Sequence, residues 1–133
     1  MKSRFSSVVL IVSNLQASVK FYRLMGLHIN YEGEDVNHVD CMQEGGCMVT
    51  LVPEVTVKKH RVGWSASVGN RIALQFNCAN QNDVDVLYTK MINEGYQNSV
   101  QPYDTPWGER YAQLLDPDGN TVAIFSVLDL PMF

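Results

Sequence analysis

The sequence predicts an α+β fold made of two tandem βαβββ modules. The order strand, helix, strand, strand, strand can be followed twice along the chain, and each predicted helix carries apolar residues at helical spacing. The two opening strands also align, because "SVVLIVSN" lines up with "RIALQFNC". One module cannot bury both a sheet face and a helix, whereas two modules can share a curved mixed sheet with the helices on its convex side. We therefore expect a single domain over residues 1–133, with modules at about residues 1–60 and 68–133.

The first module begins with a strand and a capped helix. Ser13 and Asn14 can cap a helix that runs to about Met25, and Gly26 can end it. The expected strands of this module are residues 5–12, 27–31, 36–42 and 47–52. Residues 53–69 show no periodic pattern, and we expect them to be irregular.

The second module repeats this order. Asn80 or Asn82 can cap a helix that ends near Asn93, and Gly95 can stop it. The apolar residues of this helix fall at positions i, i+3, i+4 and i+7, which are Val84, Leu87, Tyr88 and Met91. The expected strands are residues 71–78, 99–103, 109–115 and 121–127. Between the last two strands, "DPDGN" has the composition of a tight turn.

Composition and charge exclude several classes of function. The net charge of the 133-residue chain is −4, and the sequence shows none of the basic patches that nucleic-acid binding requires. The apolar run at residues 8–12 is too short for a signal peptide or a membrane span. Three cysteines are an odd number for a secreted disulfide framework. We therefore expect a cytoplasmic protein that binds neither nucleic acid nor membranes.

The two ends of the chain resemble a known superfamily. The opening "VVLIVSNLQASVKFYRLMGL" and the closing "TPWGERYAQLLDPDGNTVAIF" resemble the vicinal oxygen chelate superfamily, and the resemblance extends over nearly the whole chain. That superfamily includes glyoxalase I, extradiol dioxygenases, fosfomycin-resistance enzymes and bleomycin-resistance proteins. The resemblance implies a single glyoxalase/bleomycin-resistance-like domain, in which the paired modules form a U-shaped sheet around a cavity. It also implies a homodimer.

The resemblance further implies a metal site, but the residues at the ligand positions do not suit a metal. Metal-dependent members of the superfamily place their ligands on four strands that face the cavity. The matching positions here are Ser7, Thr50, Arg71 and Ala123. Hydroxyl groups are weak ligands for transition metals, a guanidinium repels cations, and alanine has no ligating atom. We therefore expect no metal and no cofactor.

Strand alternation indicates which side chains face the expected cavity. If the four ligand positions face it, the alternate residues of the same strands are uniformly apolar and suit the face under the helices. The expected ligand-binding residues are Ser7, His38, Asp40, Arg71, Gln75, Tyr103, Trp107, Tyr111 and Gln113. Arg71 can recognise an anionic group, or it can form a structural ion pair with Asp40 or Glu109. Trp107 can line the pocket or pack against its own turn.

Three functions agree with these residues. The first is a metal-free small-molecule-binding protein that resembles bleomycin-resistance proteins and sequesters an aromatic or anionic compound. The second is an enzyme of the same superfamily, either a metal-dependent or metal-free lyase or isomerase or a dioxygenase, with a titrating group such as His38. The third is an interaction module that retained the fold and lost the site. Whether the chain is an enzyme is left open, because one fold hosts many functions.

Overall fold

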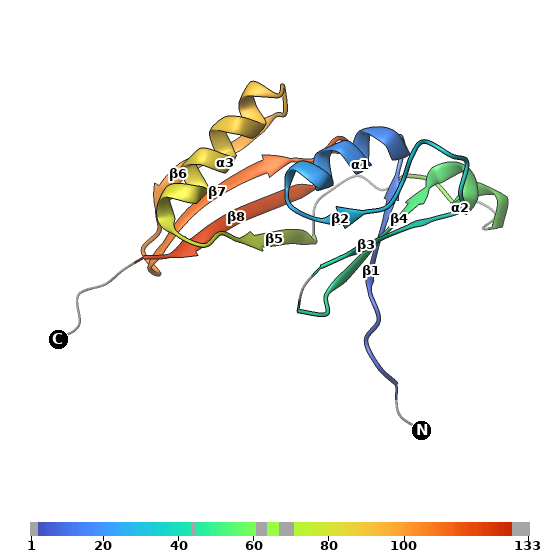
Figure 1. The fold of residues 1–133 in the computed structure, drawn as a ribbon, viewed down its shortest axis with the longest axis horizontal. Helices are drawn as coiled ribbons and strands as arrows, with labels where there is room; N and C mark the ends of the chain where they lie inside the picture. Colours follow the sequence, from blue (N-terminus) through green and yellow to red (C-terminus); the bar gives the residue numbers. More distant parts are fainter. Residues whose placement is uncertain (1–2, 44, 61–63, 67–70, 129–133) are drawn as a thin grey trace. The chain divides into compact units, whose positions relative to one another are not determined.

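The chain consists of two compact units, residues 1–67 and 68–133. The computed structural model describes residues 3–43, 45–60, 64–66 and 71–128. Each unit contains one four-stranded mixed sheet with a helix packed on it (Figure 1). The α+β class and the two tandem βαβββ modules are therefore confirmed. The joint U-shaped sheet around a cavity remains an expectation from the resemblance.

The sheet of the first unit has the strand order β1-β4-β3-β2. Its strands are β1 (Val8–Val12), β2 (His28–Ile29), β3 (Val39–Met42) and β4 (Met48–Pro53). Strands β1 and β4 are parallel, and the other neighbours are antiparallel. Val9, Thr50 and Asp40 lie in register across three strands, so they share one face of the sheet. The adjacent set of residues paired across these strands, which includes Leu51, points to the opposite face of the sheet.

Helix α1 (Leu15–Leu24) covers that opposite face. The side chain of Asn14 accepts a hydrogen bond from the backbone nitrogen of Ala17 at 3.0 Å, as expected of an N-cap. Phe21 and Tyr22 are fully buried, and their rings meet edge to face with centroids 4.9 Å apart. Leu51 of β4 is also fully buried. These large side chains form the core of the first unit.

A second helix in this unit was not expected from the sequence. Residues 53–69 were predicted to be irregular, but Glu54–His60 form helix α2. Pro53 ends the strand that precedes it, because proline cannot donate to a strand ladder. Glu54 lies in the first turn of the helix and pairs with Lys58 at 3.8 Å. The β-branched residues at 55–57 concealed this helix, because they favour strands in a reading based on propensity.

The sheet of the second unit has the strand order β5-β8-β7-β6. Its elements are β5 (Ala73–Asn77), α3 (Gln81–Asn93), β6 (Asn98–Asp104), β7 (Glu109–Leu115) and β8 (Thr121–Val127). Helix α3 packs on β6, β7 and β8 and buries Val84 and Met91 completely. The predicted turn before β8 is confirmed, since the Asp116 carboxylate accepts hydrogen bonds from the backbone nitrogens of Asp118 and Asn120.

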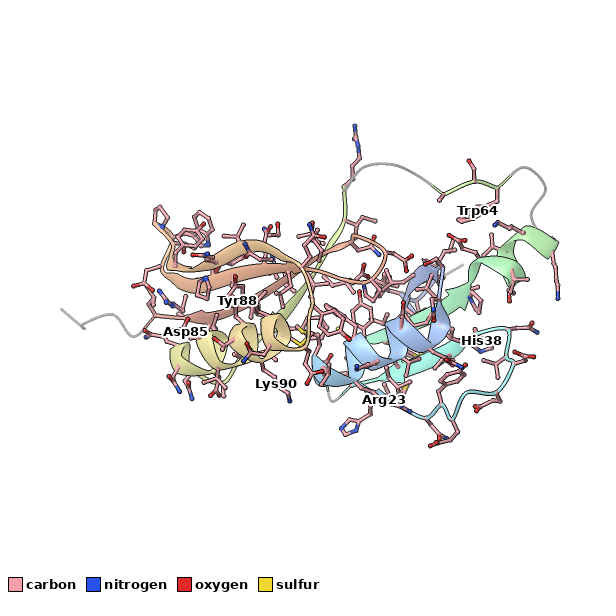
Figure 2. All side chains as sticks on the ribbon, turned by 90° about the horizontal axis from the view of Figure 1, so that it is seen from above. Arg23, His38, Trp64, Asp85, Tyr88 and Lys90 are labelled. Atoms are coloured by element: carbon pink, nitrogen blue, oxygen red, sulfur yellow. The ribbon has the colours of Figure 1, made fainter. Side chains whose placement is uncertain are left out.

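A bidentate ion pair joins α3 to the sheet. Arg110 of β7 donates from Nε and Nη2 to the two carboxylate oxygens of Asp85, at 3.1 and 3.2 Å, and from Nη1 to Asp104 at 3.2 Å. Asp85 lies on the helix (Figure 2). We expect Arg110→Met to lower the free energy of unfolding by about 1 kcal/mol at low salt and by less in 1 M NaCl. Urea denaturation at two salt concentrations measures this. A loss that is independent of salt would show that Arg110 acts through packing of its alkyl chain.

The thiol of Cys41 gives the first unit a predictable response to alkaline pH. Cys41 is fully buried, and burial together with the neighbouring Asp40 carboxylate raises the pKa of this thiol from 9.0 to about 11. The folded state thus keeps the thiol proton at a pH where the unfolded chain loses it. The stabilisation is complete below pH 9 and is lost as the pH rises towards 11.

We therefore expect the free energy of unfolding to fall by on the order of 2 kcal/mol between pH 8 and pH 11 because of this thiol. Cys41→Ala should remove this part of the decrease in the free energy of unfolding with pH, although the variant should be less stable than the wild type at every pH. Cys47→Ala is the matched control, because Cys47 is exposed. Urea denaturation across this pH range measures the slope, and an equal slope in the wild type and in Cys41→Ala would contradict the assignment.

Candidate functional site

A short series of polar side chains crosses the open face of the first sheet. The Thr50 hydroxyl donates to Oδ1 of Asp40 at 2.9 Å, and Oγ of Ser7 lies 3.5 Å from Oγ1 of Thr50. On the other side, Nε2 of His38 is 3.8 Å from Oδ2 of Asp40. Three of the predicted site residues, Ser7, His38 and Asp40, are thus brought together. Thr50, the second ligand position of this module, lies between them.

The second sheet presents a face rich in aromatic rings on the side opposite α3. Register places Tyr103 level with Tyr111, and Gln113 level with Ala123 and Gln75. Because side chains alternate along a strand, these residues share one face while their neighbours in β7, such as Leu114, are buried under the helix. We call the side chains of Gln75, Tyr103, Trp107, Tyr111 and Gln113 the aromatic face.

The rings of the aromatic face meet edge to face. The Tyr111 ring lies 6.1 Å from that of Tyr103 and 6.3 Å from that of Trp107, at interplanar angles of 85° and 74°. Trp107 stands in the turn before β7, and 65% of its surface is exposed. An exposed tryptophan held by a neighbouring tyrosine offers a flat apolar surface, which is the feature that aromatic ligands recognise.

Hydrogen bonds between polar groups hold the side chains of the aromatic face in place. Gln113 donates from Nε2 to the Tyr111 hydroxyl at 2.7 Å, and the Ser99 hydroxyl donates to Oε1 of Gln113 at 3.3 Å. The indole nitrogen of Trp107 donates to Glu109 at 2.8 Å. The sequence did not indicate roles for Ser99 and Glu109 here. Alternation could have placed Glu109 on this face, because it is two residues before Tyr111 in the same strand.

Arg71 lies apart from the aromatic face. It was predicted to belong to a strand over residues 71–78, but β5 begins at Ala73, and Arg71 is an exposed residue in the bend before it. Asn77, at the other end of β5, is level with Phe125 and therefore with Tyr111. Asn77 lies six positions after Arg71, which corresponds to roughly 20 Å of extended chain. The guanidinium therefore does not lie among the rings.

Ser7 requires a similar correction. The first strand was predicted to begin at residue 5, but β1 begins at Val8. Ser7 nevertheless reaches Thr50, because the chain continues in the direction of β1 and Val9 is level with Thr50. The two ligand positions of the first module thus lie side by side, as the resemblance implies.

The residues at the ligand positions do not fit a divalent metal. Ser7 and Thr50 supply neutral hydroxyls, Arg71 supplies a permanent cation, and Ala123 is a fully buried residue with no ligating atom. Across the described residues, no three His, Cys, Asp or Glu side chains are grouped closely enough to hold a metal ion. The metal chemistry of the superfamily therefore has no set of ligands at these positions.

Among the helices that the structure describes, none has the length and apolar character needed to cross a membrane. The homodimer and the cytoplasmic location remain predictions.

Two βαβββ modules, each with a polar or aromatic open face and a helix on the other face, define the class of this protein. Residues 4–124 match the model of the Glyoxalase/Bleomycin resistance protein/Dioxygenase superfamily, and the chain belongs to that superfamily. It is 26% identical over 125 residues to the protein YraH of Bacillus subtilis (strain 168), covering 90% of this chain and 94% of that one.

Solved structures share the fold. One is a glyoxalase/bleomycin resistance protein/dioxygenase family enzyme from Burkholderia phytofirmans PsJN, with a TM-score of 0.81, 22% identity, and coverage of 92% of this chain and 98% of that one. Another is a lactoylglutathione lyase from Agrobacterium tumefaciens, with a TM-score of 0.69, 20% identity and coverage of 95% of both chains. Likeness at this identity shows the fold and not the activity.

Proposed function

We propose that this protein is a metal-free small-molecule-binding protein, and that its aromatic face binds a planar aromatic compound. The observation that carries the proposal is the edge-to-face arrangement of Tyr103, Tyr111 and Trp107, with Trp107 mostly exposed. This group offers one exposed indole and two phenol rings that are already held in place by β6 and β7. A ligand ring that packs on them gains contact area at little cost in side-chain entropy.

The polar groups of the face favour a neutral ligand. Glu109 holds the Trp107 indole and brings a carboxylate to this part of the surface. The nearest predicted cation, Arg71, belongs to the other end of β5. An anionic group beside the rings would therefore meet a like charge, and Arg110 of β7 is already paired with Asp85 and Asp104, so such a ligand is disfavoured. Gln113 and the Tyr111 hydroxyl can instead exchange hydrogen bonds with a hydroxyl or carbonyl group of the ligand.

The unsuitable ligand positions support the metal-free part of the proposal. Catalysis by a metal in this superfamily needs side chains that hold the ion and leave it an open position. The hydroxyl, guanidinium and methyl groups at the four positions cannot do so. Binding of a ligand to the rings of the aromatic face does not require metal-ligating side chains.

Titration with acetophenone, a neutral planar aromatic ketone that does not fluoresce, tests the proposal. The Trp64→Phe variant is used throughout, so that tryptophan fluorescence reports Trp107 alone. We expect saturable quenching in this background. Adding Tyr111→Ala should weaken the affinity by on the order of tenfold, because a ring contact is lost.

Val86→Ala is the control for that experiment. Val86 is an exposed apolar residue of α3, on the other side of the sheet, and its removal should leave the affinity unchanged. Linear quenching without saturation, or equal affinities with and without Tyr111, would refute binding at the aromatic face. The compound should be recovered unchanged after prolonged incubation.

A metal-free acid–base catalyst is the second candidate function, and the polar series of the first unit favours it. Asp40 accepts a hydrogen bond from Thr50 and lies near the His38 imidazole, so a carboxylate and an imidazole stand together on an open sheet face. Such a pair can remove and return a proton beside a carbonyl group. Deuterium exchange at the α-carbon of 2-butanone, in the presence of a chelator, measures this. If the protein is such a catalyst, exchange in its presence should be faster than in buffer alone. This acceleration should fall by about 100-fold or more in Asp40→Asn.

A further inference from the structure

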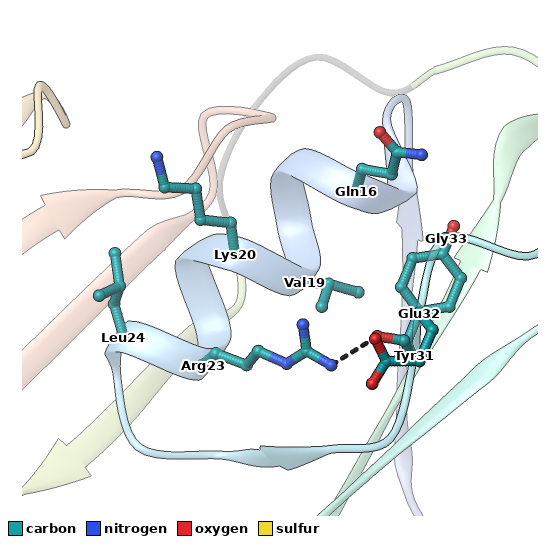
Figure 3. Close-up of a pocket in the computed structure, with 8 residues that line it drawn as sticks. All are labelled: Gln16, Val19, Lys20, Arg23, Leu24, Tyr31, Glu32 and Gly33. Atoms are coloured by element: carbon teal, nitrogen blue, oxygen red, sulfur yellow. Dashed lines mark hydrogen bonds between the residues drawn. The ribbon is translucent and has the colours of Figure 1, made fainter.

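The first unit contains a pocket that lies away from the open sheet face. Its volume is about 540 Å³, a size that suits a small organic molecule. Helix α1 forms one wall and the segment after β2 forms the other (Figure 3). The lining residues are Gln16, Val19, Lys20, Arg23, Leu24, Tyr31, Glu32 and Gly33. None of them belongs to the site described above.

Arg23 is held rigidly at the side of this pocket. Its Nε donates to the carbonyl oxygen of Ile29 at 3.2 Å, and its Nη2 donates to the carbonyls of Ile29 and Tyr31 at 2.8 and 2.6 Å. Figure 3 shows the guanidinium extended from α1 toward the opposite wall. A cation fixed in this way loses little conformational freedom when it binds a ligand.

The remaining donors of Arg23 are available for an anion. A guanidinium has five N–H groups, and the hydrogen bonds to Ile29 and Tyr31 use only Nε and Nη2. Among the described residues, no hydrogen-bond partner is found for Nη1 of Arg23. Carboxylate oxygens are natural partners for this group, because the hydrogen bonds are assisted by charge.

The rest of the lining indicates what kind of anion fits. Val19 and Tyr31 are buried and form an apolar floor, to which Leu24 adds aliphatic surface. Lys20 adds a second positive charge to the lining, whereas Glu32 adds a negative one. In the part of the chain that the structure describes, only the Nη1 group of Arg23 remains for an anion at this side of the pocket, which suits a single negative charge better than the two of a phosphate monoester.

We propose that this pocket binds a small monocarboxylate with a compact aliphatic body, with the carboxylate on Arg23 and the aliphatic part against Val19 and Leu24. This site is independent of the aromatic face and does not rest on the function proposed above.

A pair of isosteric probes tests the proposal. The anion 4-methylpentanoate and its neutral amide are titrated into the full chain, and backbone ¹H–¹⁵N shifts are followed. We expect saturable shifts for the carboxylate in α1 and in residues 31–33, with an affinity on the order of tenfold above that of the amide. Neither probe carries a ring, so binding to the aromatic face does not interfere. Shifts confined to other residues, or equal affinities for the two probes, would overturn the proposal.

Two variants with opposite expected effects complete the test. Arg23→Gln should weaken carboxylate binding by on the order of tenfold, but it also removes hydrogen bonds that hold residues 29–31. Glu32→Gln leaves those bonds in place and should strengthen binding about threefold to fivefold, since a like charge is removed. Asp35→Asn removes one exposed carboxylate outside the pocket and should change the affinity less than twofold. An unchanged or weaker affinity in Glu32→Gln would contradict the site.

Discussion

The double variant Ser7→His, Thr50→Glu is expected to acquire a divalent-metal site at two positions where the wild type has hydroxyl groups. The two hydroxyls lie 3.5 Å apart, and the Asp40 carboxylate is 2.9 Å from Thr50. An imidazole and a carboxylate at these positions would join Asp40 to give three competent ligands in one place. After equilibration with Ni²⁺ and removal of the excess, we expect about one equivalent in the double variant and less than roughly a tenth in the wild type.

Thermal or urea unfolding gives a second measure of the same site. Without metal, the double variant should be less stable than the wild type, because a second carboxylate is placed beside Asp40 near the buried position of Thr50. Ni²⁺ at 100 times its dissociation constant should then raise the free energy of unfolding by about 2.7 kcal/mol. Asp40→Asn in the double variant should abolish most of the gain. A folded double variant that takes up no metal would show that the side chains at positions 7 and 50 do not converge.

The substitution Phe21→Ala is expected to cause the largest loss of stability. Phe21 is fully buried in α1 and packs edge to face on Tyr22, with ring centroids 4.9 Å apart. Removing the ring leaves a cavity and deletes the aromatic pair, at a cost of about 3–5 kcal/mol. That cost is a large fraction of the stability of a small domain. We expect the first unit to open far more often than in the wild type, which faster amide hydrogen exchange in β1, β3 and β4 would show.

Phe5→Ala is the matched control for this prediction. It makes the same chemical change in the same unit, but 81% of the Phe5 surface is exposed. The free energy of unfolding should change by less than about 0.5 kcal/mol. If Phe5→Ala were as destabilising as Phe21→Ala, Phe5 would be buried in solution, for example by a second copy of the chain.

Local patterns were enough to predict which residues share a sheet face. Alternation placed Gln75, Tyr111 and Gln113 together, and the register of β5, β7 and β8 confirms that these positions form one face. The same alternation holds in β3, where Val39 and Cys41 are buried and Asp40 between them is exposed. Alternation succeeds here because the direction of a side chain in a strand depends only on its own backbone.

Patterns failed where a residue lies at the end of a strand or where a helix is short. Arg71 was assigned to a strand whose first residue is Ala73, so its distance from the rings was not foreseen. Helix α2 was missed because seven residues are too few to show a helical period, and strand-forming residues occupy its centre. The limits of an element depend on hydrogen bonds to neighbouring strands, which the local sequence does not contain.

By itself, the sequence determined the superfamily resemblance, the two-module order, the faces of the strands and the unsuitability of the ligand positions for a metal. Only the tertiary structure decided that Ser7, Thr50, Asp40 and His38 meet. It also decided that the rings of Tyr103 and Trp107 meet the ring of Tyr111, and that Arg23 is fixed beside a pocket. The reason is physical. Residue type and alternation are local properties, whereas each of these groups depends on the register between strands or on backbone carbonyls supplied by another element.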